Sequence, residues 1–305
     1  MIHITNLRDG LEVFKSLGSE IRIRILEVLL ENGPMNMNSI ASSLNITSGS
    51  LTGHIKKLED CGLITTTNET ASHGNQKICS IAQYKVLLDF EEAMQDTSLF
   101  NTHVRIGQFT SHNVYPTCGL ATSEKVVGSL DDVRYFNHPD RYNADILWFT
   151  KGYVEYTIPN LIPLNSRVST IAISMEISSE APGVNSNWPS DISFFINDVP
   201  LGMWTSPGDF GDKKGIFTPM WWSANLNQYG LLKMLVIGKD GTYIEGLKIS
   251  DVSCNDLNLD SNSDIRFRIA VLDDAKNIGG ITLFGKSFGN YDQDIDVSIN
   301  YVPIS

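Results

Sequence analysis

The chain has 305 residues, a formal net charge of −12 and only four cysteines. This length predicts two domains rather than one small domain. The cysteines form no Cys-x-x-Cys pair, which excludes the usual zinc and thioredoxin motifs. No apolar run approaches the ~20 residues of a membrane helix, and residues 1–9 lack the apolar stretch of a signal peptide, so the sequence predicts a cytoplasmic protein without a membrane partner.

The negative charge is unevenly distributed along the chain. Residues 1–90 hold 8 Lys or Arg and 9 Asp or Glu, whereas residues 91–305 hold 15 and 26. A nearly neutral segment can approach a polyanion, while an acidic body is repelled from it. Contacts with nucleic acid are therefore expected in the first third of the chain, where they should be few and local.

The first third begins with a predicted pair of helices. An amphipathic helix starts at Ser19-Glu20 and ends at Asn32-Gly33-Pro34, which is a helix stop signal. Residues 38–46 predict a short second helix and a turn. Two helices joined by a short turn form a helix-turn-helix unit.

The next predicted helix carries the most informative pattern of the chain. Thr47 or Ser48 can cap its start by accepting a backbone hydrogen bond. Leu51, Ile55 and Leu58 recur at helical spacing and predict a buried face. The remaining small, polar and basic residues face outward and suit insertion into a DNA major groove. The predicted DNA-binding residues of this helix are Ser48, Gly49, Ser50, Thr52, Gly53, His54, Lys56 and Lys57.

A two-stranded wing is predicted after this helix. Gly62 occupies a position suited to a left-handed C-cap, and residues 63–67 and 77–81 then predict two strands. The polar segment 68–76 joins them, and its tip is expected to contact phosphates through His73 and Lys77. A second amphipathic run, residues 84–94, is expected to close the domain as a helix.

Three segments together resemble the ArsR-type winged-helix repressors: residues 20–26, 40–44 and, most specifically, 52–64. The resemblance covers roughly the first third of the chain. It implies a homodimer, paired through the first and last helices of the domain, that binds a palindromic double-stranded DNA operator. The chain departs from the family at Gly53, in the middle of the recognition helix, and at residues 35–39, which lack the metal-sensing thiols. Metal sensing is therefore not expected.

Two other interpretations of this region stay open. Helix-turn-helix patterns also occur in modules that bind proteins rather than DNA. Lys56-Lys57 is followed by Glu59-Asp60, so this surface also suits an ordinary solvated helix face.

Beyond residue 100 the helical period gives way to short apolar or alternating runs, separated by Gly, Pro, Asn and Asp. Lys239-Asp240-Gly241 between two of these runs is a hairpin signal. We therefore predict an α+β two-domain chain: a winged helix-turn-helix in residues 1–98 and an antiparallel β-sandwich of jelly-roll type in residues 99–305. The predicted strands are residues 146–149, 152–158, 168–177, 191–196, 231–237, 243–249, 265–271, 281–284 and 294–301.

Four of the five tryptophans fall within residues 180–230, among Asp and Asn in Gly- and Pro-rich loops. Indole faces pack against the C–H faces of sugars, and amides and carboxylates bond to sugar hydroxyls, so this composition resembles that of carbohydrate-binding modules. The same tryptophans also suit a lid over the end of a sandwich, whereas Trp148 is expected in the core. The predicted ligand-binding residues are Asn187, Trp188, Asp191, Trp204, Asp209, Trp221, Trp222 and Asn227.

No catalytic motif, cofactor motif or metal-binding motif is recognisable, so no enzyme activity, cofactor or metal is predicted. The alternating acids of residues 256–264 and 292–296 are expected to be solvated loop residues. Cys118 is expected in a loop beside Pro116 and Gly119, where a pocket-lining or redox-active thiol is one alternative.

These observations predict a homodimeric DNA-binding regulator whose sandwich senses a small molecule such as a sugar, and the family resemblance implies that it is a repressor. Two alternatives stay open. One is a carbohydrate-active enzyme fused to a DNA-binding domain, with Asp209 and Asp212 as a glycosidase pair. The other is a sandwich that serves only oligomerisation.

Overall fold

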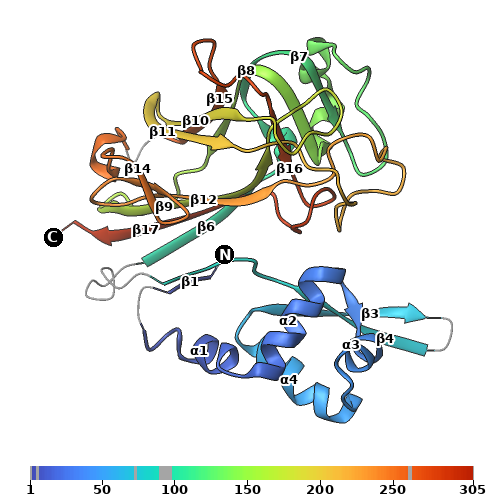
Figure 1. The fold of residues 1–305 in the computed structure, drawn as a ribbon. Helices are drawn as coiled ribbons and strands as arrows, with labels where there is room; N and C mark the ends of the chain where they lie inside the picture. The colour runs from blue at the N-terminus through green and yellow to red at the C-terminus, as the bar shows by residue number, and fades with distance from the viewer. Residues whose placement is uncertain (1, 5–6, 72–73, 89–97, 260–262, 305) are drawn as a thin grey trace. The chain divides into compact units, whose positions relative to one another are not determined.

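The computed structural model describes residues 2–4, 7–71, 74–88, 98–259 and 263–304 (Figure 1). The chain divides into two compact units, Met1–Asp96 and Thr97–Ser305, each described below by itself. Among the described residues, no helix has the length and apolar character needed to cross a membrane.

Four helices build the described part of the N-terminal unit. Ser19 precedes the second helix, while the side chains of Asn36 and Thr47 accept backbone hydrogen bonds at the starts of the third and fourth. Thr47 Oγ1 lies 3.2 Å from the Ser50 nitrogen, which confirms the predicted cap. The helices are α1 (Leu11–Leu17), α2 (Glu20–Asn32), α3 (Met37–Leu44) and α4 (Ser48–Asp60).

The end of α4 is fixed by a left-handed glycine. Gly62 has a φ of 75°, and its backbone N–H donates to the Glu59 carbonyl oxygen. The Leu63 N–H donates to the Leu58 carbonyl oxygen, 3.0 Å away, which completes a Schellman motif. This turn redirects the chain from the helix into the wing, as the sequence predicts.

The wing strands β3 (Ile64–Ala71) and β4 (Gly74–Ile81) pair in an antiparallel sheet, with β2 (Met35–Asn36) on the other side of β4. The unit's core lies between the helices and this sheet. Its most deeply buried apolar residues include the predicted face of α4; they are Ile25, Ile40, Leu51, Ile55, Leu58, Ile64 and Cys79.

The expected closing helix of residues 84–94 is wrong in its described part. Residues 86–88 form strand β5 (Val86–Leu88), which pairs in parallel with β1 (Ile2–Ile4). The backbone of this short apolar run is hydrogen-bonded to the start of the chain. A local helical pattern does not reveal such a long-range pairing. Residues 89–94 lie outside the described part, so the dimer contact that a last helix would supply gains no support here.

The C-terminal unit is an antiparallel jelly-roll sandwich, as predicted. One layer has the strand order β11-β10-β15-β8-β7, and the other has β6-β17-β9-β12-β13-β14. Strand β16 pairs with both β8 and β9 and so joins the layers at one edge. The strands are β6 (Ser98–Val104), β7 (Ser111–Ala121), β8 (Ile146–Ile158), β9 (Ser166–Ser178), β10 (Ser190–Ile196), β11 (Val199–Ser206), β12 (Leu231–Ile237), β13 (Thr242–Ile244), β14 (Leu247–Ser250), β15 (Ile265–Val271), β16 (Ile281–Phe284) and β17 (Ile295–Pro303).

Short 3-10 helices occupy some connections between these strands: η2 (Ile106–Gln108), η3 (Val133–Asn137), η4 (Pro139–Asn143) and η5 (Cys254–Asp256). The predicted hairpin joins β12 to β13, with Gly241 at a φ of 142°. The predicted runs 146–149 and 152–158 form the single strand β8, whereas run 243–249 divides into β13 and β14.

The loop predicted around Cys118 is wrong, because this residue lies in β7. Its side chain is completely buried in the core between the two layers. Burial raises the pKa of the thiol to about 11, so it carries no thiolate at neutral pH. Cys118 is therefore a small core residue rather than a reactive or pocket-lining group.

Candidate DNA-binding helix and ligand pocket

The surface of α4 separates into a buried face and an outward face. Of the residues predicted to contact DNA, Ser48, Gly49, Ser50, Thr52, Gly53, Lys56 and Lys57 are exposed. His54 is half-buried, and burial lowers the pKa of its imidazole, with smaller contributions from Arg22 and Lys57. The outward face is thus polar and locally basic, without a large apolar side chain.

A groove runs between α4 and the wing. Ser48, Thr52 and Lys56, spaced four residues apart along α4, line it together with Glu59 and Lys77. Glu59 connects the two elements, because it accepts hydrogen bonds from Thr66 of β3 and from Lys77 of β4.

The Lys77 ammonium lies 3.3 Å from the Glu59 carboxylate, which also has its pKa lowered by the Thr66 hydrogen bond and by Lys77. Part of the charge of Lys77 is therefore neutralised within the unit. Lys56 is the other exposed lysine that lines the groove. The other predicted wing contact, His73, lies outside the described residues.

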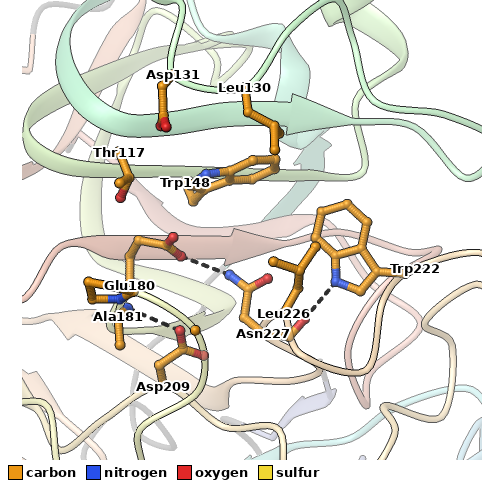
Figure 2. A pocket seen from close by; sticks show the side chains of 12 residues that line it. Thr117, Leu130, Asp131, Trp148, Glu180, Ala181, Asp209, Trp222, Leu226 and Asn227 are labelled. Atoms are coloured by element: carbon orange, nitrogen blue, oxygen red, sulfur yellow. Dashed lines mark hydrogen bonds between the residues drawn. The ribbon is translucent and has the colours of Figure 1, made fainter.

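The C-terminal unit has a pocket beside the edge where β16 joins the two layers (Figure 2). It encloses about 170 Å³. Strand β8 supplies Trp148, the segment after β9 supplies Glu180 and Ala181, and the long connection between β11 and β12 supplies Asp209 and Asn227. The remaining lining residues are Thr117, Leu130, Asp131, Pro182, Gly183, Trp222 and Leu226.

Aromatic rings build one side of this pocket. The rings of Trp148 and Trp222 meet edge to face, with centroids 5.7 Å apart and planes at 69°. Trp222 also contacts Phe288 edge-on at 5.1 Å and donates its indole N–H to the Asn227 carbonyl oxygen. Trp148 fits there because Gly119 of β7 leaves room for its ring; a Cβ at Gly119 would lie 2.3 Å from the indole.

Carboxylates build the other side of the pocket. Glu180 Oε2 accepts hydrogen bonds of 2.9 Å from the Asn227 side-chain amide and from the Thr282 hydroxyl. Asp209 Oδ2 accepts one from the Ala181 backbone N–H, whereas its buried Oδ1 has no hydrogen-bond partner.

The environment of both acids disfavours their charged forms. Burial raises the pKa of Asp209 to about 7. Burial, and then the neighbouring Asp209, raise the pKa of Glu180 well above its usual value. Two acids with strongly raised pKa values in one concave site are typical of functional sites.

The pocket gathers some of the predicted ligand-binding residues, namely Asp209, Trp222 and Asn227. Trp221 packs edge-on against Trp222 and donates its indole N–H to the Ser123 carbonyl oxygen, with 41% of its surface exposed. It is adjacent to the pocket but does not line it.

The other four predicted ligand residues lie elsewhere. Asp191 is buried in β10 and bonded to Thr205 and Asn277, which makes it a structural residue rather than an open ligand contact. Trp204 packs against the sandwich core from β11, beneath the Lys233 ammonium. Asn187 and Trp188 are exposed in the loop before β10 and do not line the pocket.

Two important residues of the site escaped the sequence prediction. Trp148 was expected in the core; it is only 7% exposed, but that exposed part faces the pocket. Glu180 follows β9 and carries no motif. Its clustering with Asp209 depends on tertiary structure, so the sequence offered no direct signal for it.

Residues 19–65 match a family described as winged helix-turn-helix DNA-binding, and the N-terminal unit is a winged helix-turn-helix domain. The uncharacterized protein MJ0432 of Methanocaldococcus jannaschii is 38% identical over 52 residues. That match covers 17% of this chain and 56% of the relative, so the chain spans little more than half the relative's length.

Solved structures similar to each unit were also found. HlyU from Vibrio cholerae is 21% identical, with 25% of this chain and 78% of that chain covered and a TM-score of 0.22. An ArsR family transcriptional regulator is 26% identical, with 24% and 71% covered and a TM-score of 0.21. A carbohydrate-binding module, CBM36 in complex with calcium and xylotriose, is 12% identical, with 65% and 98% covered and a TM-score of 0.28.

Proposed function

We propose that this protein is a cytoplasmic, homodimeric transcription regulator whose C-terminal sandwich binds a small effector. Helix α4 enters the major groove of a two-fold symmetric operator, and β3 and β4 lie against the flanking backbone. Two such helices would read half-sites about one helical turn apart. The effector occupies the pocket of Trp148, Glu180, Asp209 and Trp222, and it alters the protein's affinity for the operator.

The DNA-binding part of the proposal is supported by the winged helix-turn-helix match over residues 19–65. The exposed residues Ser48, Thr52 and Lys56 beside the wing support it further. The near-neutral charge of the first 90 residues implies that few phosphates are contacted, so affinity should depend only moderately on salt.

The effector part depends mainly on one observation: the pocket combines aromatic rings with a buried carboxylate oxygen, Asp209 Oδ1, that has no hydrogen-bond partner among the described residues. A buried acceptor without a hydrogen bond is costly, and a ligand that donates to it removes that cost. Sugars present both a C–H face for indole and hydroxyl donors for carboxylates, so they are the first compounds to test.

For the effector to regulate DNA binding, it must bind two arrangements of the dimer with different affinities. Couplings of this kind are typically about 1–3 kcal/mol, which corresponds to a change in operator affinity of roughly 5–150-fold. Repression relieved by the effector is the mode expected from the family resemblance.

The DNA-binding proposal is tested by selecting fragments from a random DNA pool with the full-length chain. We expect an enriched two-fold symmetric sequence. Lys56→Ala should weaken binding and lower the slope of log affinity against log salt by about one unit. Lys15→Ala is the matched control, because Lys15 is an exposed lysine of α1 already paired with Glu12. Equal affinities for the two variants would contradict the assigned DNA face.

The effector proposal is tested through tryptophan fluorescence and thermal unfolding with a panel of mono- and oligosaccharides. All five tryptophans lie beyond residue 97, so their fluorescence reports on the sandwich alone within the full-length chain. A saturable change that Trp222→Phe weakens and Trp188→Phe preserves would support the pocket. Operator binding is then measured with and without that compound.

A second candidate is glycoside hydrolysis, because Glu180 and Asp209 place two carboxyl groups with raised pKa values in one pocket. Asp212, the partner expected from the sequence, is instead exposed and bonded to the Tyr229 hydroxyl. Turnover of a glycoside that Asp209→Asn abolishes would favour this candidate over effector binding.

A further inference from the structure

We infer that the pocket of the sandwich takes a small organic cation, namely a ring-bearing primary ammonium such as an amino sugar. This inference rests on the proposed role of the pocket as an effector site and specifies the chemistry of the effector. It follows from the balance of charge, hydrogen-bond donors and aromatic surface in the pocket.

The pocket is acidic and contains no counter-charge of its own. Glu180, Asp209 and Asp131 line it, whereas none of its lining residues is Lys, Arg or His. Buried carboxylates in proteins are normally paired with a cation or bonded to several donors. No protein cation among the lining residues favours the ionised forms of these acids, so we assign that role to a positive charge on the ligand.

The available hydrogen bonds point in the same direction. Asp209 is 1% exposed and accepts one hydrogen bond, at Oδ2, while its Oδ1 has no partner. Asp131 Oδ1 accepts from the Cys118 backbone N–H, and Glu180 Oε2 accepts from Asn227 and Thr282. An ionised carboxyl group offers only acceptors, whereas an ammonium group offers three donors and no acceptor. The two are complementary in both charge and hydrogen bonding.

The aromatic side of the pocket also suits a cation. Trp148 and Trp222 line it in edge-to-face contact with each other, and indole attracts cations more strongly than other aromatic rings do. The remaining apolar surface, from Leu130 and Leu226, can cover a ring. The cavity of about 170 Å³ is small, so a single ring with one amine is the expected size class.

A metal ion is a less suitable source of the charge. Among the described residues, no group of three or more His, Cys, Asp or Glu side chains has the arrangement of a metal site. Calcium takes six to eight oxygen ligands, far more than Asp209 and Glu180 supply. An ammonium group needs only the few acceptors that the pocket presents.

The inference is tested by calorimetry on the full-length chain with matched probes. 6-Amino-6-deoxyglucose is compared with glucose, and cyclohexylamine with cyclohexanol, so that each pair differs by one ammonium group. We expect each amine to bind at least about tenfold more tightly than its alcohol, as charge-assisted hydrogen bonds are roughly twice as strong as neutral ones. The amines should also bind more tightly at about pH 8 than at about pH 5.5, because Asp209 must ionise.

Proton release gives a second readout. Titrations at about pH 6 in two buffers of different ionisation enthalpy should show that amine binding releases up to about one proton, since a bound cation lowers the pKa values of the acids. Asp209→Asn should reduce this release and weaken the amines about tenfold, with little effect on the alcohols. Asp212→Asn, which removes a nearby exposed charge outside the pocket, is the matched control and should change neither.

The outcomes separate this inference from the proposed function. If glucose binds as tightly as 6-amino-6-deoxyglucose and no proton is released, the inference of a cationic ligand is overturned, while the proposal of an effector pocket stands. If Asp209→Asn binds the amines as tightly as the wild type does, the ammonium group binds elsewhere, and the inference is again overturned. If neither member of either pair binds at millimolar concentration, the inference of a cationic ligand is overturned, and the saccharide panel alone decides whether the pocket binds an effector.

Discussion

The indole rings of Trp148 and Trp222 contact each other edge to face, with ring centroids 5.7 Å apart. One ring comes from strand β8 and the other from the long connection between β11 and β12. The contact therefore attaches an irregular segment to the sandwich and at the same time forms the aromatic side of the pocket (Figure 2). Stability and ligand binding are consequently expected to depend on the same pair.

Trp222→Ala should destabilise the sandwich strongly. Trp222 is 4% exposed and contacts Trp148, Trp221 and Phe288, so its removal leaves a cavity that costs about 3–5 kcal/mol. Trp188→Ala is the comparison, because Trp188 is 36% exposed, and its removal should cost no more than about 1 kcal/mol. Urea unfolding followed by tryptophan fluorescence measures both. A similar loss in the free energy of unfolding for the two variants would contradict the buried contacts of Trp222.

Asp209→Asn should change the pH dependence of stability. The pKa of Asp209 in the folded chain is about 7, whereas that of an unfolded Asp is about 3.9. Between these values the folded state binds a proton that the unfolded state has lost, so the free energy of unfolding decreases as pH rises. This group contributes a slope of at most about 1.4 kcal/mol per pH unit.

Unfolding of wild type and Asp209→Asn from about pH 4 to about pH 8 measures this effect. The variant should show a shallower decrease and be about 1–3 kcal/mol more stable than wild type at the alkaline end. The decrease should not vanish in the variant, because burial also raises the pKa of Glu180, which remains there. Parallel curves for the two proteins would show that Asp209 is ionised throughout.

The winged helix was predictable because its signals are local. The cap at Thr47, the apolar spacing of Leu51 and Ile55, and the left-handed position at Gly62 all lie within one short segment. The family match over residues 19–65 and the structure agree with that prediction. By contrast, the pairing of β1 with β5 joins opposite ends of the unit, and no local pattern in residues 84–94 reveals it.

In the sandwich, the three strands that the sequence did not reveal are β6, β7 and β11. Each is hydrogen-bonded to a single neighbouring strand and therefore lies at an edge of the sheet. Edge strands are partly exposed and tolerate Pro and Gly, as at Pro116 in β7 and Pro200 in β11. Their patterns are consequently weaker than those of buried strands such as β9.

The pocket was only partly predictable for a related reason. Composition pointed to the loops that carry Asp209, Trp222 and Asn227, but it did not distinguish them from the structural Asp191 or the core-packed Trp204. Glu180 joins the site through the pairing of β9 with β16, and Trp148 through the space left by Gly119. Neither relationship is visible before the strands are paired.

Gly53→Ala tests whether α4 approaches DNA closely at the position where the chain departs from the family pattern. Gly53 lies in the helix interior, and a Cβ there would meet no atom within 4 Å apart from its chain neighbours and the backbone of its own helix. The substitution should therefore raise stability by about 0.5–1 kcal/mol, because alanine favours the helix. Gly62→Ala is the contrasting change and should lower stability by about 1 kcal/mol, since its φ of 75° suits glycine.

We expect Gly53→Ala to weaken operator binding although it stabilises the fold, because its methyl group projects from the outward face that is proposed to enter the major groove. Thermal unfolding and operator titration on the same preparation separate the two effects. A variant that is more stable and binds the operator as tightly as wild type would place Gly53 outside the DNA interface. The contacts would then be restricted to the Ser48, Thr52 and Lys56 side of the helix, beside the wing.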